Sequence, residues 1–282
     1  MNALLLAVVT VCLTMQTITK RIYNDKVTVD GKYCFSTIVA LAALLFFVVT
    51  AGPLSFCIEL LPYAVAFGLS YAVATIFSFA AIACGPLSIT SLLISYSLLM
   101  PTLYGLIFLK EQADIGIIGG ILLLVVSLYL ICAKREKAKI TGKWLLYTLL
   151  ASIGNGACSI VQKMQQDSFD GAYKNEFMIA SLLLVTCVIG TIALVRERGA
   201  LRACYKPGLL YGGGCGVANG IANLLVMVLA NRLSASLLYP TISAGNIVLT
   251  YVISTLLFRE KLVKRQLVGL FLGVAAVILL NL

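Results

Sequence analysis

The sequence contains no histidine, and charged residues make up only 11% of its 282 residues. Without histidine, a proton relay lacks its usual carrier near neutral pH, and a zinc site would need thiolates or carboxylates alone. The nine cysteines are scattered through apolar runs without CxxC spacing, so we interpret them as small buried hydrophobic residues. We therefore expect neither a metal site nor a cofactor. The scarcity of charge also excludes an ordinary soluble domain, in which roughly 25% of residues are charged.

Long apolar runs dominate what is present: 61% of the residues are hydrophobic and the mean hydropathy is +1.04. The runs approach the roughly 20 residues that a helix needs to cross a bilayer, and they lack the alternation of a membrane β-barrel. We therefore predict an all-α integral membrane protein embedded in the lipid bilayer. The first run has no basic residue before it and no small-residue cleavage site, so we expect a retained span rather than a signal peptide. The ten expected spans are 2–19, 33–51, 61–83, 87–109, 115–133, 143–162, 176–195, 208–230, 234–257 and 263–281.

The net charge of +10 is distributed unevenly over the loops between these spans. Loops after odd-numbered spans hold 17 of the 21 lysines and arginines, whereas the opposite side has only Lys110, Lys163, Lys174 and Arg232. Basic loops remain in the cytoplasm, so both termini are predicted to lie outside a cytoplasmic membrane. The basic charge is thereby explained without a nucleic-acid partner. The 17 residues are Lys20, Arg21, Lys26, Lys32, Lys134, Arg135, Lys137, Lys139, Lys143, Arg196, Arg198, Arg202, Lys206, Arg259, Lys261, Lys264 and Arg265.

The second half of the chain echoes the first. A Phe-x-x-Glu element ends at Glu111 and a Phe-x-Glu element ends at Glu260, and a glycine follows each glutamate nine residues later, at Gly120 and Gly269. The order of such matches predicts two five-helix repeats, 1–139 and 140–282. Because five is odd, the second repeat would enter the membrane inverted, an arrangement typical of secondary transporters.

These elements resemble the drug/metabolite transporter superfamily, and among its members the EamA-like bacterial transporters of ten spans. The resemblance implies that spans one to four and six to nine surround a central cavity, while five and ten support it. Many members carry a tryptophan–glycine pair in span one. This chain has Thr10-Val-Cys12 there, and its only tryptophan is Trp144. Inferences about substrate that depend on the missing tryptophan therefore do not transfer.

Spans five and ten contain few polar side chains and are interpreted as packing elements. Gly269 and Gly273 form a GxxxG pair, for which packing within the chain is favoured over dimerisation. The oligomeric state, monomer or homodimer, stays open.

Polar residues of the other spans fall on helical faces, such as the stripe of Ser152, Asn155, Ser159 and Gln162. A hydroxyl in a membrane helix often bonds only to a carbonyl one turn back, whereas an amide needs a neighbouring helix or water. Both explanations stay open for the amides, and the shared faces favour a wet cavity. The predicted substrate-binding residues are Gln16, Tyr71, Ser95, Asn155, Ser159, Asn219, Asn223, Tyr239, Ser243 and Asn246.

Two prolines, Pro101 and Pro240, are expected inside spans four and nine. Each lacks an N–H and so frees the carbonyl four residues before it, at Ser97 and Ser236 respectively. We interpret these positions as gating hinges or as static kinks.

No acidic or basic residue is expected near the centre of a span, and Lys20 and Lys163 are interpreted as snorkelling lysines at helix ends. Proton-coupled pumps usually place a carboxylate in the membrane, so a small polar or zwitterionic metabolite fits better than a bulky cation. We therefore predict a secondary transporter working by alternating access, with an amino acid or a related compound as solute. Multidrug or quaternary-amine efflux is the alternative within transport, and a non-transporting scaffold or sensor is the alternative from another class. An enzyme is not expected, because no cluster of nucleophile, acid or metal ligand occurs at membrane depth.

Overall fold

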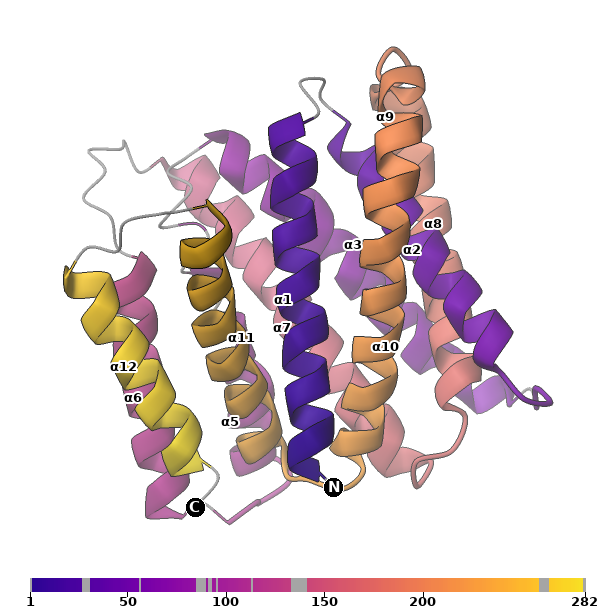
Figure 1. The fold of residues 1–282 in the computed structure, drawn as a ribbon. Helices are drawn as coiled ribbons and strands as arrows, with labels where there is room; N and C mark the ends of the chain where they lie inside the picture. The colour runs from indigo at the N-terminus through magenta and orange to yellow at the C-terminus, as the bar shows by residue number, and fades with distance from the viewer. Residues whose placement is uncertain are drawn as a thin grey trace. The chain divides into compact units, whose positions relative to one another are not determined.

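The computed structural model describes residues 2–26, 31–55, 57–84, 90, 93–94, 96–112, 114–132, 141–258 and 264–280. Throughout these ranges the regular secondary structure is helical (Figure 1). The elements are α1 (Asn2–Lys26), α2 (Lys32–Thr50), η1 (Ile58–Leu60), α3 (Leu61–Cys84), η2 (Tyr96–Leu98), α5 (Leu99–Ile107), α6 (Ile115–Cys132), α7 (Gly142–Ser168), α8 (Lys174–Arg196), α9 (Leu201–Pro207), η3 (Gly208–Gly212), α10 (Gly213–Ala230), α11 (Ala235–Phe258) and α12 (Lys264–Leu280).

Six helical stretches in the described residues are long and apolar enough to cross a membrane, and Ile115–Leu130 is a shorter apolar helix. The prediction of an all-helical chain with several membrane helices is therefore confirmed. Most helices follow the expected ranges closely, but two run past their expected ends. Helix α1 continues to Lys26 instead of ending at residue 19, so Lys20 lies inside it rather than at a helix end. Helix α7 continues to Ser168 instead of ending at residue 162. In the expected span 87–109, residues 87–89, 91–92 and 95 lie outside the described residues, and the described part includes η2 and α5.

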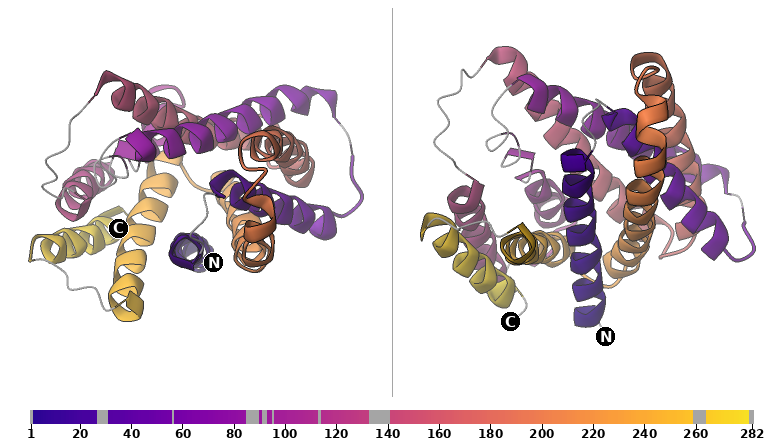
Figure 2. Two further views of the ribbon diagram at one scale, coloured as in Figure 1. Left: turned by 90° about the horizontal axis from the view of Figure 1, so that it is seen from above. Right: turned by 45° about the horizontal axis from the view of Figure 1, so that its top comes forward.

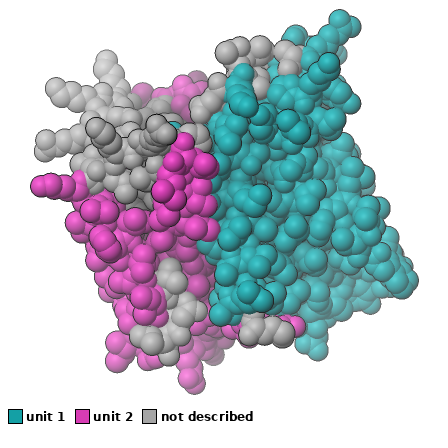
Figure 3. Space-filling view, in the orientation of Figure 1, with its two compact units in different colours: residues 1, 3–72, 161–231 teal, residues 2, 73–160, 232–282 magenta. Residues whose placement is uncertain are grey.

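The chain forms two compact units (Figure 3). Unit 1 is built chiefly from Ala3–Ala72 and Val161–Asn231, and unit 2 chiefly from Val73–Ile160 and Arg232–Leu282. Each unit thus takes residues from both halves of the sequence. This division by compactness leaves the expected repeat boundary near residue 140 a prediction.

In unit 1, helix α2 packs against α8 and α10. Small residues make the second contact close: a Cβ at Gly216 of α10 would lie 2.5 Å from the Val39 carbonyl oxygen and 2.5 Å from the Ala42 Cβ. The start of α2 is held by Glu197, whose carboxylate accepts hydrogen bonds from the backbone N–H groups of Tyr33 and Cys34 at 3.0 and 2.7 Å. An acidic residue at a helix N-terminus satisfies free N–H groups and complements the helix dipole.

In unit 2, α6 and α12 lie side by side (Figures 1 and 2). Gly119 and Gly120 of α6 face Leu279 and Leu280 of α12, and the Ser127 hydroxyl donates a 2.6 Å hydrogen bond to the Gly269 carbonyl. The two helices therefore pack on each other, as their small number of polar side chains indicates. Gly273 faces Ser127 and Val248, so this member of the GxxxG pair packs within the chain.

The two expected hinge prolines lie in different local structures. Pro240 sits inside α11, which continues to Phe258. Pro101 is in the first turn of α5, directly after the 3₁₀ turn η2 that contains Ser97. A proline has no N–H to bond four residues back, and tighter 3₁₀ turns are frequent at helix ends. Pro101 thus marks a change of helix type rather than the middle of an α-helix.

Candidate functional site

Four side-chain amides of unit 1 form one hydrogen-bonded chain, which we call the amide relay: Gln16 of α1, Asn219 and Asn223 of α10, and Gln162 of α7. Gln162 Nε2 donates to Asn223 Oδ1 at 2.8 Å. Asn223 Nδ2 donates to the Asn219 carbonyl at 2.9 Å and to its Oδ1 at 3.1 Å. Asn219 Nδ2 donates to Gln16 Oε1 at 3.0 Å. The relay therefore joins three helices with uncharged groups alone.

Three of the four relay residues, Gln16, Asn219 and Asn223, are predicted substrate-binding residues, and the structure brings them together. Of the two explanations left open for the amides, hydrogen bonding between helices is the one that these contacts show directly. Gln16 is the exception, because only 4% of its surface is exposed and its Nε2 has no hydrogen-bond partner among the described residues. An unpaired buried donor costs about 1–3 kcal/mol, so this atom is where the relay is incomplete.

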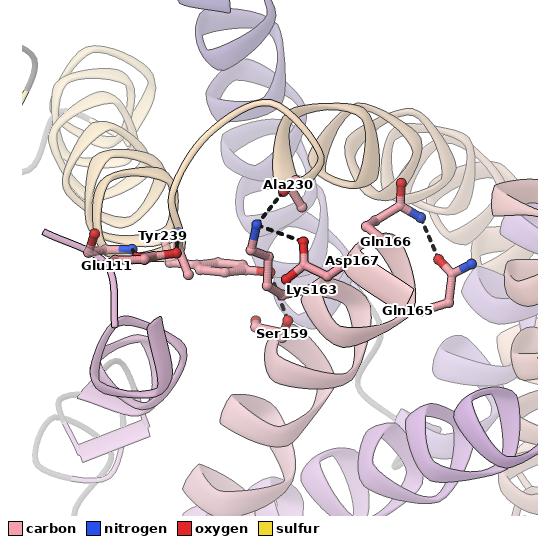
Figure 4. A network of polar contacts seen from close by, with 10 residues as sticks. Glu111, Ser159, Lys163, Gln165, Gln166, Asp167, Ala230 and Tyr239 are labelled. Atoms are coloured by element: carbon pink, nitrogen blue, oxygen red, sulfur yellow. Dashed lines mark hydrogen bonds and ion pairs between the residues drawn. The ribbon is translucent and has the colours of Figure 1, made fainter. Parts of the chain in front are cut away.

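Lys163 does not snorkel at a helix end as expected. It lies inside α7, is only 7% exposed, and donates a 2.7 Å hydrogen bond to the Ala230 carbonyl (Figure 4). Its ammonium also pairs with Asp167, one turn later in α7, at 3.0 Å. Ala230 is the last residue of α10, so the positive charge sits at the negative end of that helix dipole. The lysine therefore ties α7 to α10 close to the relay residue Gln162.

Predicted site residues of unit 2 also make specific contacts. The Tyr239 hydroxyl of α11 donates to the Ser159 carbonyl of α7 at 2.7 Å (Figure 4). Asn155 Nδ2 donates to the Ser97 hydroxyl of η2 at 2.7 Å. Ser243, on the same face of α11 as Tyr239, is buried and its hydroxyl has no hydrogen-bond partner among the described residues.

The remaining predicted residues contribute in simpler ways. Asn246 of α11 accepts from the Thr250 hydroxyl one turn later, at 3.3 Å. Tyr71 of α3 packs in unit 1 beside the core residues Val185 and Ile189. Ser95 lies outside the described residues.

Glu111, noted in the sequence only as part of a repeated element, fixes the start of α11. Its carboxylate oxygens accept hydrogen bonds from the backbone N–H groups of Ala235 and Ser236 at 2.7 and 2.9 Å. Gly105 leaves room for this arrangement, since a Cβ there would press on the Glu111 carboxylate and on Ala235. The helix that presents Tyr239 and Ser243 is thus anchored by a charge outside it.

Sequence reasoning missed Gln165 and Gln166, which are fully buried three and four residues after the relay residue Gln162. Gln166 donates to Gln165 Oε1 (Figure 4), and Gln165 Nε2 donates to the Ala172 carbonyl at 2.9 Å. Both were expected in a loop, because the predicted span stops at residue 162 and the polar residues after it carry no apolar periodicity. The role of Glu197 in capping α2 likewise carried no local signal.

The described residues thus place buried amides, hydroxyls and one buried lysine inside apolar helices. Groups of this kind are able to donate hydrogen bonds to a polar solute and to accept them. Among the described residues no group of His, Cys, Asp and Glu is placed to hold a metal ion.

The model of the EamA-like transporter family matches residues 142–282, which run from α7 to the end of the chain. The chain belongs to the EamA-like transporter family. This membership, with the several apolar helices, identifies a multi-pass membrane transporter of the drug/metabolite transporter kind, and it points to transport rather than to enzymatic activity.

A protein of known crystal structure has the same fold as this EamA-like chain. Its TM-score is 0.83 at 12% sequence identity, over 100% of this chain and 98% of that one. No curated protein matches the chain. The likeness at this identity shows the fold alone, so the solute must be argued from the residues of this chain.

Proposed function

We propose that the protein is a secondary transporter that moves a small polar or zwitterionic metabolite, such as an amino acid or a related compound, across the cytoplasmic membrane. The observation that carries this proposal is the amide relay, which places four neutral hydrogen-bonding side chains on apolar helices α1, α7 and α10. Amides in a membrane helix are kept where they bind each other, water or a solute. A relay without charged groups suits a solute with no net charge, such as a zwitterion.

The proposal includes the topology: ten spans as two inverted five-helix repeats, 1–139 and 140–282, with both termini outside. The uneven basic loops and the paired glutamate elements support it. Alternating access would then move one part of the bundle against another around the bound solute, with Pro101 and Pro240 as candidate hinges.

A thermal-shift screen of the purified protein tests the solute class. Amino acids, sugars, nucleosides and quaternary amines are added separately, and a binding solute raises the unfolding temperature by mass action. We expect amino acids or close relatives to stabilise the protein. Stabilisation by quaternary amines alone would favour the efflux alternative. A panel without any stabilising solute, together with no flux into liposomes, would favour a scaffold or sensor.

A further inference from the structure

The direction of the amide relay is fixed by one backbone group. Asn223 Nδ2 lies 2.9 Å from the Asn219 carbonyl oxygen, which can only accept a hydrogen bond. The nitrogen of Asn223 must therefore be on this side, and its Oδ1 must face away, toward Gln162. Gln162 consequently donates through its Nε2, at 2.8 Å. An exchange of nitrogen and oxygen in either side chain would bring like groups together.

The same reasoning continues to the other end of the relay. Asn223 Nδ2 also lies 3.1 Å from Asn219 Oδ1, so the Asn219 nitrogen faces Gln16. Gln16 accepts from that nitrogen with its Oε1 at 3.0 Å, so its Nε2 is the last atom of the relay. Every bond in the relay therefore points the same way, and the relay ends in a donor rather than in an acceptor.

This terminal donor is buried and unsatisfied. Gln16 is 4% exposed, and its Nε2 has no partner among the described residues. A buried N–H₂ group needs an acceptor, and hydrogen bonds that run in one direction polarise one another, which strengthens the donor at the end. The missing partner is therefore an acceptor oxygen.

The charge nearby selects among acceptors. Lys20 lies one helical turn after Gln16 on α1 and is exposed. A positive charge at this spacing favours a negative acceptor over a neutral one, and hydrogen bonds to charged groups are roughly twice as strong as neutral ones. A carboxylate oxygen meets both requirements.

We propose that Gln16 is a specificity-determining residue whose side-chain N–H₂ donates to a carboxylate oxygen of the transported solute. This inference rests on the proposed transport function and adds the group that is recognised and the atom that recognises it. The other relay amides position Gln16, because Asn219 binds its Oε1 and thereby leaves its Nε2 available to the solute.

The first test compares solutes that differ only in the carboxylate. Alanine, leucine and phenylalanine are each paired with the amine that lacks the carboxyl group, and competition for uptake is measured in proteoliposomes. Wild type is expected to prefer the amino acid by about tenfold or more, the range of a charge-assisted hydrogen bond. Gln16→Met, of similar length but without a donor, should remove most of this preference, and Gln16→Glu should reverse it toward the amine.

Two variants serve as controls. Thr17→Val changes the neighbouring residue, which is exposed and whose hydroxyl bonds only to the Leu13 carbonyl of its own helix, so the preference should persist. Gln16→Asn keeps the amide group on a shorter side chain. This variant is used in place of Gln16→Met if the methionine variant does not fold. If Gln16→Met lost flux equally for the amino acid and for its amine in each pair, the inference would be overturned. The proposed transport function would still stand. Absence of flux for every solute in wild type would refute the proposed function, and the inference with it.

A second readout does not depend on transport. The chain has six glutamines, so selective ¹⁵N labelling gives six side-chain amide groups, and the one missing in Gln16→Met is assigned to Gln16. We expect the Gln16 signals to move on addition of leucine and not of its decarboxylated amine. Signals that stay fixed with every transported amino acid would show that the Gln16 amide does not contact the solute, and would overturn the inference.

Discussion

At the scale of single residues, carboxylates and one ammonium group secure the ends of helices. Glu111 satisfies two N–H groups at the start of α11, Glu197 does the same for α2, and Lys163 binds the last carbonyl of α10. Helix ends leave backbone groups unpaired, and in an apolar environment each unpaired group is costly. Three of the scarce charges of this sequence thus lie where backbone groups need a partner.

Replacement of Glu111 by alanine should destabilise the protein. The change removes two short hydrogen bonds to the N–H groups of Ala235 and Ser236, and we expect a loss of about 1–3 kcal/mol in the free energy of unfolding. Glu111→Gln keeps one acceptor oxygen, so its free energy of unfolding should lie between those of wild type and Glu111→Ala. Unfolding in detergent by heat or denaturant gives the measurement. Asp114→Ala is the matched control, because that carboxylate is exposed and binds only the next N–H group; an equal loss there would contradict the account.

The Lys163–Asp167 pair is tested by a double-mutant cycle. Lys163→Met leaves the Ala230 carbonyl and Asp167 without their partner, so we expect about 1–3 kcal/mol of destabilisation. Asp167→Asn should cost less, since the Asp167 side chain is 37% exposed and pairs with an exposed member are worth about 0–1 kcal/mol. The exposed Lys206→Met controls for loss of charge and should be neutral. Full additivity of the Lys163 and Asp167 effects would show that the pair is not coupled.

At the scale of helices, glycines decide how closely α10 approaches α2. A Cβ at Gly216 would meet backbone atoms of α2, which cannot move aside as a side chain can, whereas nothing lies within 4 Å of a Cβ at Gly214 of the same helix. Gly216→Ala should therefore cost about 1–3 kcal/mol. Gly214→Ala should be neutral or stabilising by up to about 1 kcal/mol, because alanine favours the helix. Thermal unfolding of both variants tests this, and similar stabilities would refute the packing argument.

Helices are also the scale at which the sequence was most informative. Apolar runs of membrane length predicted elements such as α2 and α8 almost to the residue, because hydrophobicity alone determines them. The predicted ends of spans one and six were wrong, since α1 continues to Lys26 and α7 to Ser168. Lys163, Gln165 and Gln166 looked like a polar loop, yet they are buried and contact Ala230 and Ala172 inside unit 1. The contact between Lys163 and Ala230, which are 67 residues apart, carries no periodic signal. Helical spacing likewise predicted polar faces, but not that Gln16 bonds Asn219 across helices.

At the scale of the whole molecule, the charge distribution predicts an orientation. Seventeen basic residues follow odd-numbered spans, so both termini should lie outside the cytoplasm. Alkaline phosphatase fused after Leu282 should be active, and a green fluorescent protein fused there should be dark. The opposite result would reverse the orientation. It would leave the relay unchanged, because the relay's hydrogen bonds do not depend on which side is cytoplasmic.

The central claim is that buried neutral amides in an EamA-like transporter handle a polar solute. Counterflow of labelled amino acids in proteoliposomes tests it most directly, with wild type beside Asn223→Leu, which breaks the relay at its middle. The account predicts flux above empty vesicles for wild type and a loss of at least about tenfold for Asn223→Leu, since Gln162 and Asn219 both lose a partner. Thr17→Val should retain full flux. Equal flux in Asn223→Leu and wild type, or no flux in either, would contradict the account.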